Sequence, residues 1–201
     1  TIEDLAKENR LPVYLVNFTQ RDAAEQAQNL TSLKLADKKT RREIASIMGS
    51  VSFDTPYGKQ MKRFLQNGVG LHHAGLLPKY RLLVENLAQK SLLKVISGTD
   101  TLGVGVNIPI RTVLFTKLYK FDGQQLRILR ARNFHQIAGR AGRKGFDEAG
   151  SVVCQAPVHV IANKKLLAKA SSNAKGRRPK KVALQKPPKG YVGYNEDTFD
   201  A

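Results

Sequence analysis

Short apolar runs alternate along this chain with longer segments whose apolar residues recur at helical spacing. The runs predict buried strands, and the amphipathic segments predict helices. Strands are expected at residues 13–18, 69–72, 93–97, 112–115 and 151–155, and helices at 21–30, 38–48, 58–65, 79–89 and 131–141. From residue 69 onward strands and helices largely alternate, which is typical of βαβ units.

The predicted strands are rich in Val, Leu and Ile and show little alternation with polar residues. Strands of this kind are expected where helices cover both faces of a sheet. The pattern therefore predicts an α/β fold with a mostly parallel, doubly wound sheet. In such sheets ligands bind at the loops that follow the carboxyl ends of the strands, so we expect chemistry after Phe18, His72, Ser97 and Phe115.

The net charge of the chain indicates the kind of partner that it binds. The 201 residues include 34 Lys and Arg against 16 Asp and Glu, a formal net charge of +18, which favours a polyanion such as nucleic acid over a membrane surface. Residues 164–201 hold 10 of the basic side chains and 3 of the acidic ones. We therefore divide the chain into a globular domain, residues 1–163, and a basic extended tail, residues 164–201. The tail is either a solvated linker or a sequence-independent contact for RNA.

The only cysteine, Cys154, excludes an internal disulfide, and no Cys/His cluster has the spacing of zinc ligands, so no metal site is predicted. No apolar run reaches the length of a membrane span, and Thr1–Asp4 lacks the pattern of a signal peptide. These features predict a cytoplasmic protein with no membrane partner. The missing initial Met and the abrupt end at Ala201 suggest a piece of a longer protein.

The octad Gln136–Arg143 places two arginines, Arg140 and Arg143, three residues apart among glycines. Planar guanidinium groups can bind phosphate oxygens through two parallel hydrogen bonds, and Gly139 and Gly142 let the backbone approach closely. Taken alone, the octad is equally compatible with a solvated helix end.

Two further loops follow predicted strands. In Gly98–Pro109, Thr99 and adjacent amides at a helix start could hold a phosphate, whereas an ordinary glycine-rich turn is the commoner structure for such a loop. The loop His72–Gly75 ends in small residues that let a nucleic-acid backbone come close. Its adjacent histidines, considered alone, are more often structural than metal ligands.

Together these segments resemble, in the same order, motifs four, four-a, five and six of superfamily-two helicases. The matching segments are Phe18–Arg21, His72–Leu76, Gly98–Pro109 and Gln136–Arg143. Two others, Lys120–Arg127 and Gly145–Gly150, resemble superkiller-like DExH helicases, which remodel RNA for degradation. Within this group the chain is most similar to a bacterial branch with a C-terminal extension.

The resemblance implies the second RecA-like motor domain of an ATP-dependent RNA helicase. Its cofactor would be ATP with Mg²⁺, bound mainly by an N-terminal RecA-like domain of the same protein, which acts as a partner. The implied catalytic residues are Gln136, Arg140 and Arg143, and Gly105 and Asn107 would lie near the nucleotide. Implied contacts with the nucleic-acid backbone are Thr19, His73, Gly75, Thr99 and Asp100.

The sequence lacks two motifs that a complete helicase motor needs to hydrolyse ATP. No phosphate loop occurs, since Gly58-Lys59 is followed by Gln60 rather than Ser or Thr. Asp147–Gly150 imitates a DEAD box but does not follow an apolar strand, and we assign it to a surface turn. This chain alone is therefore expected not to hydrolyse ATP.

Asp122-Gly123 lies between two short extended segments and is a hairpin signal. In superkiller-like helicases a hairpin near this place is linked to strand separation, and an ordinary surface turn is the alternative. For the whole chain, two other functions remain open: a DNA-repair helicase motor domain and a non-enzymatic basic nucleic-acid-binding module.

Overall fold

The computed structural model describes residues 1–100, 102, 108–142, 145, 147–173 and 182–199. The chain divides into two compact units. The first unit comprises Thr1–Thr116 and Arg130–Val153, and the second comprises Lys117–Leu129 and Cys154–Ala201.

The first unit is built on a five-stranded sheet with the strand order β2-β3-β1-β4-β7. Its strands are β1 (Val13–Asn17), β2 (Val69–His72), β3 (Val95–Thr99), β4 (Thr112–Phe115) and β7 (Ser151–Cys154). β1 pairs in parallel with β3 and β4, and β2 pairs in parallel with β3. Every residue of β1, β2, β3 and β4 is buried. The predicted α/β fold with a mostly parallel sheet is therefore confirmed.

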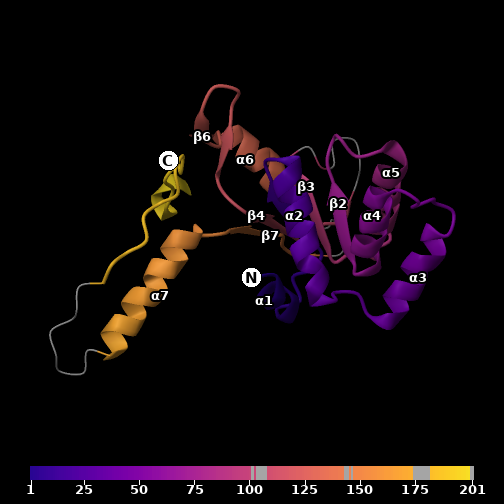
Figure 1. The fold of residues 1–201 in the computed structure, drawn as a ribbon, viewed down its shortest axis with the longest axis horizontal. Helices are drawn as coiled ribbons and strands as arrows, with labels where there is room; N and C mark the ends of the chain where they lie inside the picture. The colour runs from indigo at the N-terminus through magenta and orange to yellow at the C-terminus, as the bar shows by residue number, and fades with distance from the viewer. Residues whose placement is uncertain (101, 103–107, 143–144, 146, 174–181, 200–201) are drawn as a thin grey trace. The chain divides into compact units, whose positions relative to one another are not determined.

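Helices of the first unit surround this sheet (Figure 1). They are α1 (Ile2–Lys7), α2 (Gln20–Leu30), α3 (Lys38–Met48), α4 (Pro56–Gln66), α5 (Pro78–Gln89) and α6 (Ala131–Ala138). A 3-10 turn, η1 (Thr31–Leu33), follows α2. In Figure 1, α2 crosses the face of the sheet that is turned toward the viewer, where it contacts β2 and β3.

Local capping explains where several of these helices begin. The Asp37 carboxylate accepts from the Thr40 N–H at 2.7 Å, and the Thr55 hydroxyl accepts from the Gly58 N–H at 3.0 Å. Pro56 opens α4 at a position where a backbone donor would have no helical partner. The local sequence therefore determines where α3 and α4 begin.

The second unit contains a β-hairpin and a helix. β5 (Tyr119–Phe121) pairs antiparallel with β6 (Leu126–Ile128), which confirms the hairpin signal at Asp122-Gly123. Helix α7 spans Val158–Asn173, and a 3-10 turn, η2, spans Glu196–Phe199.

Helix α7 corrects the expected extended tail, because residues 164–173 are helical. The reason is local propensity: this stretch is dominated by Lys, Leu and Ala, which are strong helix formers. Residues 182–195 lack helix and strand, as expected. Within the part of the chain that the structure describes, no helix combines the length and apolarity needed to cross a membrane.

Candidate nucleotide and nucleic-acid site

The parallel strands of the first unit bring three of the singled-out loops to one edge of the sheet. Asn17 at the end of β1 lies in register with Thr99 at the end of β3, and His72 at the end of β2 lies in register with Gly98. Phe115 at the end of β4 is in register with Val16. Thr19, His73, Gly75 and Asp100 follow these strands in the chain, so residues distant in sequence share one edge.

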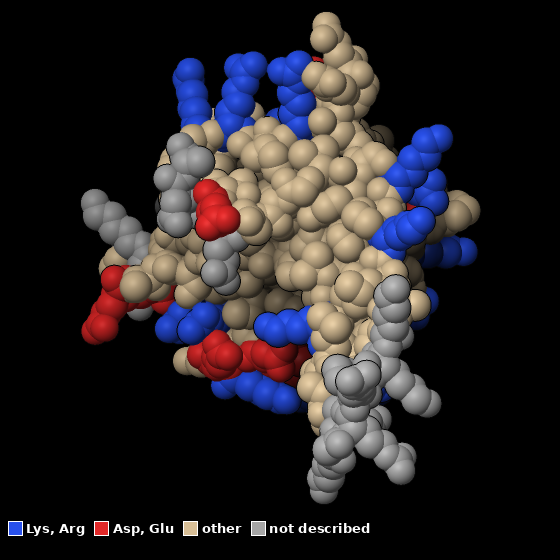
Figure 2. All heavy atoms as spheres, turned by 90° about the vertical axis from the view of Figure 1, so that its left-hand side faces the viewer, with Lys and Arg blue, Asp and Glu red and all other residues tan. Residues whose placement is uncertain are grey.

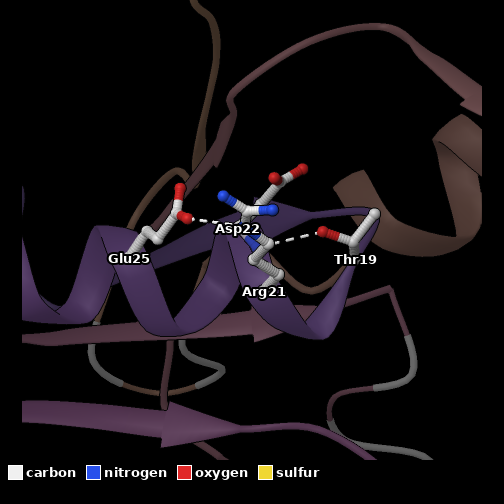
Figure 3. Close-up of polar contacts among 4 residues, drawn as sticks. All are labelled: Thr19, Arg21, Asp22 and Glu25. Atoms are coloured by element: carbon white, nitrogen blue, oxygen red, sulfur yellow. Dashed lines mark hydrogen bonds and ion pairs between the residues drawn. The ribbon is translucent and has the colours of Figure 1, made fainter.

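Thr19 is an exposed residue that caps helix α2 (Figure 3). Its hydroxyl oxygen accepts from the Asp22 N–H at 2.9 Å, and in this cap the hydroxyl keeps a hydrogen that it can donate. Arg21 on the same turn pairs with Glu25 at 2.8 Å. Thr19 therefore combines a hydroxyl donor on an exposed residue with the positive end of an 11-residue helix, an arrangement that suits a phosphate.

A buried polar chain fixes α2 against the sheet. The Ser97 hydroxyl on β3 donates to the Ala23 carbonyl of α2 at 2.8 Å. The same hydroxyl accepts from the Asn17 side-chain amide at 3.0 Å. Because these groups are buried, breaking one bond would leave a desolvated partner, so the start of α2 is held firmly at the sheet edge.

Gly75 lies directly against the first residue of α2. A Cβ at Gly75 would lie 2.7 Å from Oε1 and 3.0 Å from Nε2 of the Gln20 side chain. Glycine therefore allows the loop after β2 to pack on the loop after β1. Gln20 was not among the predicted site residues, although it lies within Phe18–Arg21, the segment that resembles helicase motif four.

The two adjacent histidines, at the last residue of β2 and the residue after it, are buried. His72 Nε2 lies 2.9 Å from Oε1 of Glu85 on α5, and the His73 side chain is 6% exposed. Burial, together with the neighbouring His72, lowers the pKa of His73, so this ring is neutral near pH 7. The buried His73 ring therefore offers little surface to a ligand. No described group of three or more His, Cys, Asp or Glu side chains could hold a metal ion.

Tyr14, the second residue of β1, is hydrogen-bonded to the last residue of β3. Its hydroxyl donates to the Thr99 carbonyl at 2.5 Å, and its side chain is fully buried. Burial and the charge of Asp100 raise the Tyr14 pKa, while the charge of Arg140 opposes this rise. Arg140 and Asp100, 40 positions apart in the chain, therefore both act electrostatically on one buried hydroxyl.

The octad begins on α6 and continues into a tightly packed turn. Gln136 is exposed on α6, and Arg140 is half-buried just beyond the helix end. Gly142 has a φ of +92°, and its N–H donates to the Ile110 carbonyl at 2.9 Å. A Cβ at Gly150 would collide with the Ala141 carbonyl. These contacts hold the Arg140 backbone near the start of β4.

Three predicted site residues, Gly105, Asn107 and Arg143, lie outside the described residues. Asp147, which we assigned to a surface turn, differs from expectation. Its side chain is only 2% exposed and lies 3.8 Å from Arg111 Nε. The ion pair with a residue at the start of β4 draws the carboxylate inward, a long-range contact that the local sequence does not encode.

Basic side chains remain prominent on the surface. Lysines and arginines project around the face drawn in Figure 2, with acidic side chains between some of them. Together with the net charge of +18, this surface suits a polyanionic partner.

Comparison with known proteins identifies the family. Residues 38–145 match the helicase conserved C-terminal domain. The chain belongs to this helicase family. The match includes the loops after β2 and β3 and the whole octad, so it covers most of the strand edge described above, while β1 and Thr19 precede it.

Relatives of this helicase domain are of the superkiller type. Superkiller complex protein 2 of Mus musculus is 38% identical over 164 residues, which are 77% of this chain and 13% of that protein. Exosome RNA helicase MTR4 of Homo sapiens is 33% identical over 159 residues, 76% of this chain and 15% of that protein. Antiviral helicase SKI2 of Saccharomyces cerevisiae is 34% identical over 159 residues, 76% of this chain and 12% of that protein. The chain is thus a superkiller-like helicase C-terminal domain that spans a small fraction of these relatives.

Residues 156–201 match a different family, a domain of unknown function (DUF3516). This match agrees with the C-terminal extension implied by the resemblance. A bacterial origin stays a prediction, as does the domain boundary at residue 163. Helix α7 runs through that position.

Proposed function

We propose that this chain is the second motor domain of an ATP-dependent, superkiller-like RNA helicase. The observation that carries the proposal is the helicase match over residues 38–145, which contains the ends of β2, β3 and β4 on the edge that these strands share with β1. Relatives named as RNA helicases favour RNA over DNA as the substrate. The alternative of a DNA-repair helicase is tested by comparing the unwinding of RNA and DNA duplexes.

The chemistry of the octad fits half of a nucleotide site. ATP with Mg²⁺, bound chiefly by an N-terminal RecA-like domain, would supply the phosphoryl group whose transfer drives the motor. Arg140 and Arg143 would donate hydrogen bonds to phosphate oxygens, and Gln136 would orient the γ-phosphate or the attacking water. Gly105 and Asn107 would lie beside the nucleotide. The half-buried position of Arg140 supports this role, because partial desolvation strengthens its attraction to an anion.

Nucleic-acid contacts are assigned to the loops after β1, β2 and β3. Thr19 would donate to a phosphate at the start of α2, while Gly75 lets the backbone of the bound strand approach. His73 would contribute its main chain. Thr99 and Asp100, at the end of β3, would also contact the nucleic-acid backbone. Their support is the shared strand edge and, for Thr19, its exposure and its place at the start of α2.

The hairpin supplies a second candidate contact. Asp122 Oδ1 accepts from the N–H groups of Gln124 and Gln125, each at 2.9 Å, and Oδ2 pairs with Arg127 at 3.1 Å. These bonds stiffen the turn, next to which the Phe121 ring is 60% exposed. An exposed aromatic ring can stack on an unpaired base. We therefore assign the hairpin to strand separation.

The test is made in the full-length protein that contains this chain. Arg143→Ala and Arg140→Ala are expected to abolish ATP hydrolysis while sparing RNA binding, measured by phosphate release and fluorescence anisotropy. Arg63→Ala is the matched control, because Arg63 is exposed on α4, outside the octad. ATP hydrolysis at the wild-type rate in both octad variants would overturn the proposal.

A non-enzymatic basic module makes the opposite prediction. In that case, changing Gln136, Arg140 and Arg143 together would leave binding equally salt-sensitive, and nucleotide would have no effect on the full-length protein. The isolated chain should hydrolyse no ATP under either proposal, so the full-length protein must be used.

A further inference from the structure

The β5–β6 hairpin is too small to be stable through its own contacts. Each strand has three residues. Isolated two-stranded hairpins are marginal in water and need packing against another element. The hairpin must therefore obtain stability from elsewhere in its unit.

Aromatic side chains of the C-terminal segment provide that packing. The Tyr119 ring on β5 meets the Tyr191 ring edge-on, with centroids 5.8 Å apart and an interplanar angle of 85°. The centroid of the Tyr194 ring lies 6.3 Å from that of Tyr119 and 6.2 Å from that of Tyr191. His159 on α7 stands edge-on to Tyr191 at 4.7 Å. One cluster thus joins the hairpin, α7 and the C-terminal segment.

A glycine turn brings the segment against the second strand of the hairpin. Gly190 has a φ of +78°, and the Tyr191 N–H donates to the Pro188 carbonyl at 3.1 Å across the turn. A Cβ at Gly190 would lie 3.3 Å from Cδ1 of Leu126 on β6. Both the positive φ and the close approach favour glycine at this position.

The segment is itself anchored to the rest of its unit. The Asn163 side chain on α7 donates to the Gln185 carbonyl at 3.0 Å and accepts from the Gln185 N–H at 2.7 Å. The Tyr194 hydroxyl donates to the Gln155 carbonyl at 2.8 Å. Burial, together with the neighbouring Tyr191 and Tyr119, raises the pKa of Tyr194 to about 12, so its hydroxyl keeps the hydrogen that it donates.

We propose that residues 156–173 and 182–195, which lie within the match to the domain of unknown function, brace the β5–β6 hairpin, with Tyr191 as the positioning residue. The brace gives this segment a structural task that the helicase domain alone does not perform. It stabilises two three-residue strands by packing Tyr119 of β5 on an anchored aromatic cluster and placing Gly190 against Leu126 of β6. The proposal concerns the order of the hairpin and stands independently of ATP or RNA binding.

The test is hydrogen–deuterium exchange of the full-length protein, read by mass spectrometry on peptides that cover residues 119–128. Tyr191→Ala and, separately, Gly190→Ala are each expected to speed exchange in the hairpin about tenfold. Tyr191→Ala removes a ring that packs on the hairpin, and Gly190→Ala strains the turn before Tyr191 and crowds Leu126. Peptides that cover β1 and β3 should exchange as in the wild type. Leu184→Ala is the matched control, since Leu184 is 51% exposed in the same segment.

Selective loss of protection in the hairpin in either variant supports the brace. If neither variant loses protection selectively there, whether exchange is unchanged or rises throughout the protein, the proposal is wrong. Tyr194→Phe refines the result, because it keeps the ring and removes only the bond to the Gln155 carbonyl. It should raise hairpin exchange less than Tyr191→Ala does.

Discussion

The hydroxyl of Tyr14 donates a 2.5 Å hydrogen bond to the carbonyl oxygen of Thr99, 85 positions away in the sequence. This bond joins β1 to the last residue of β3, directly before Asp100. Arg140 also acts electrostatically on the hydroxyl. Tyr14 thus lies beneath a residue proposed to contact nucleic acid and near one proposed to contact ATP.

Tyr14→Phe should therefore destabilise the protein by about 1 kcal/mol, because it removes one buried hydrogen bond while keeping the ring. Urea unfolding followed by circular dichroism measures this change. Tyr57→Phe is the control, since Tyr57 is 36% exposed on α4. Equal loss of stability in the two variants would show that the Tyr14 hydroxyl has no special role.

Stability should fall as the pH is lowered below about 6.5, the ordinary pKa of histidine. The folded protein lowers the pKa of His73, so between the folded and unfolded values the unfolded state binds more protons. Stability is therefore present above the unfolded pKa and is lost as the pH falls through the folded pKa.

His73→Gln should make this pH dependence shallower, as measured by urea unfolding from pH 7.5 to 5. His135→Gln is the matched control, because His135 is exposed on α6. A slope in His73→Gln that matches the wild type would contradict the assignment.

Gly75→Ala should change folding stability little and weaken RNA binding several-fold. The added Cβ would meet the end of the flexible Gln20 side chain, which can rotate away but then occupies space beside Thr19. Anisotropy with a single-stranded RNA measures the effect. Adding Gln20→Ala should restore most of the affinity, and additive losses in the double variant would rule out this coupling.

Phe121→Ala in the full-length protein should reduce duplex unwinding while leaving RNA-stimulated ATP hydrolysis near the wild-type rate. The ring is 60% exposed beside a turn held by Asp122, so its removal takes away a stacking surface without opening the core. Strand-displacement and phosphate-release assays separate the two activities. Tyr57→Ala is an aromatic control on α4, and unwinding at the wild-type rate in Phe121→Ala would remove the hairpin from the mechanism.

Much of the first unit could be predicted from local patterns. The strands at residues 69–72 and 112–115 and the helix at 38–48 have the bounds that apolar runs and helical spacing indicated. The strand predicted at 93–97 instead covers Val95–Thr99. Its last residues, Gly98 and Thr99, have weak strand propensity alone and are held by pairing with β1 and β2.

Other features could not be seen locally. Helix α1 was not predicted, since six residues offer too little periodicity. The inward pairing of Asp147 and the contact of Gln20 with Gly75 each join residues from separate segments. Which segments become neighbours depends on the strand order, and periodicity does not encode strand order.

By itself, the sequence determined the α/β class, the helix caps, the hairpin turn and the helicase motifs, because each depends on residues a few positions apart. Tertiary structure alone decided that β3 lies between β2 and β1, which brings Tyr14 under Thr99. It also decided that Tyr119, His159 and Tyr191 form one cluster. These relationships arise from packing between distant segments, where burial and shape select partners that no local pattern specifies.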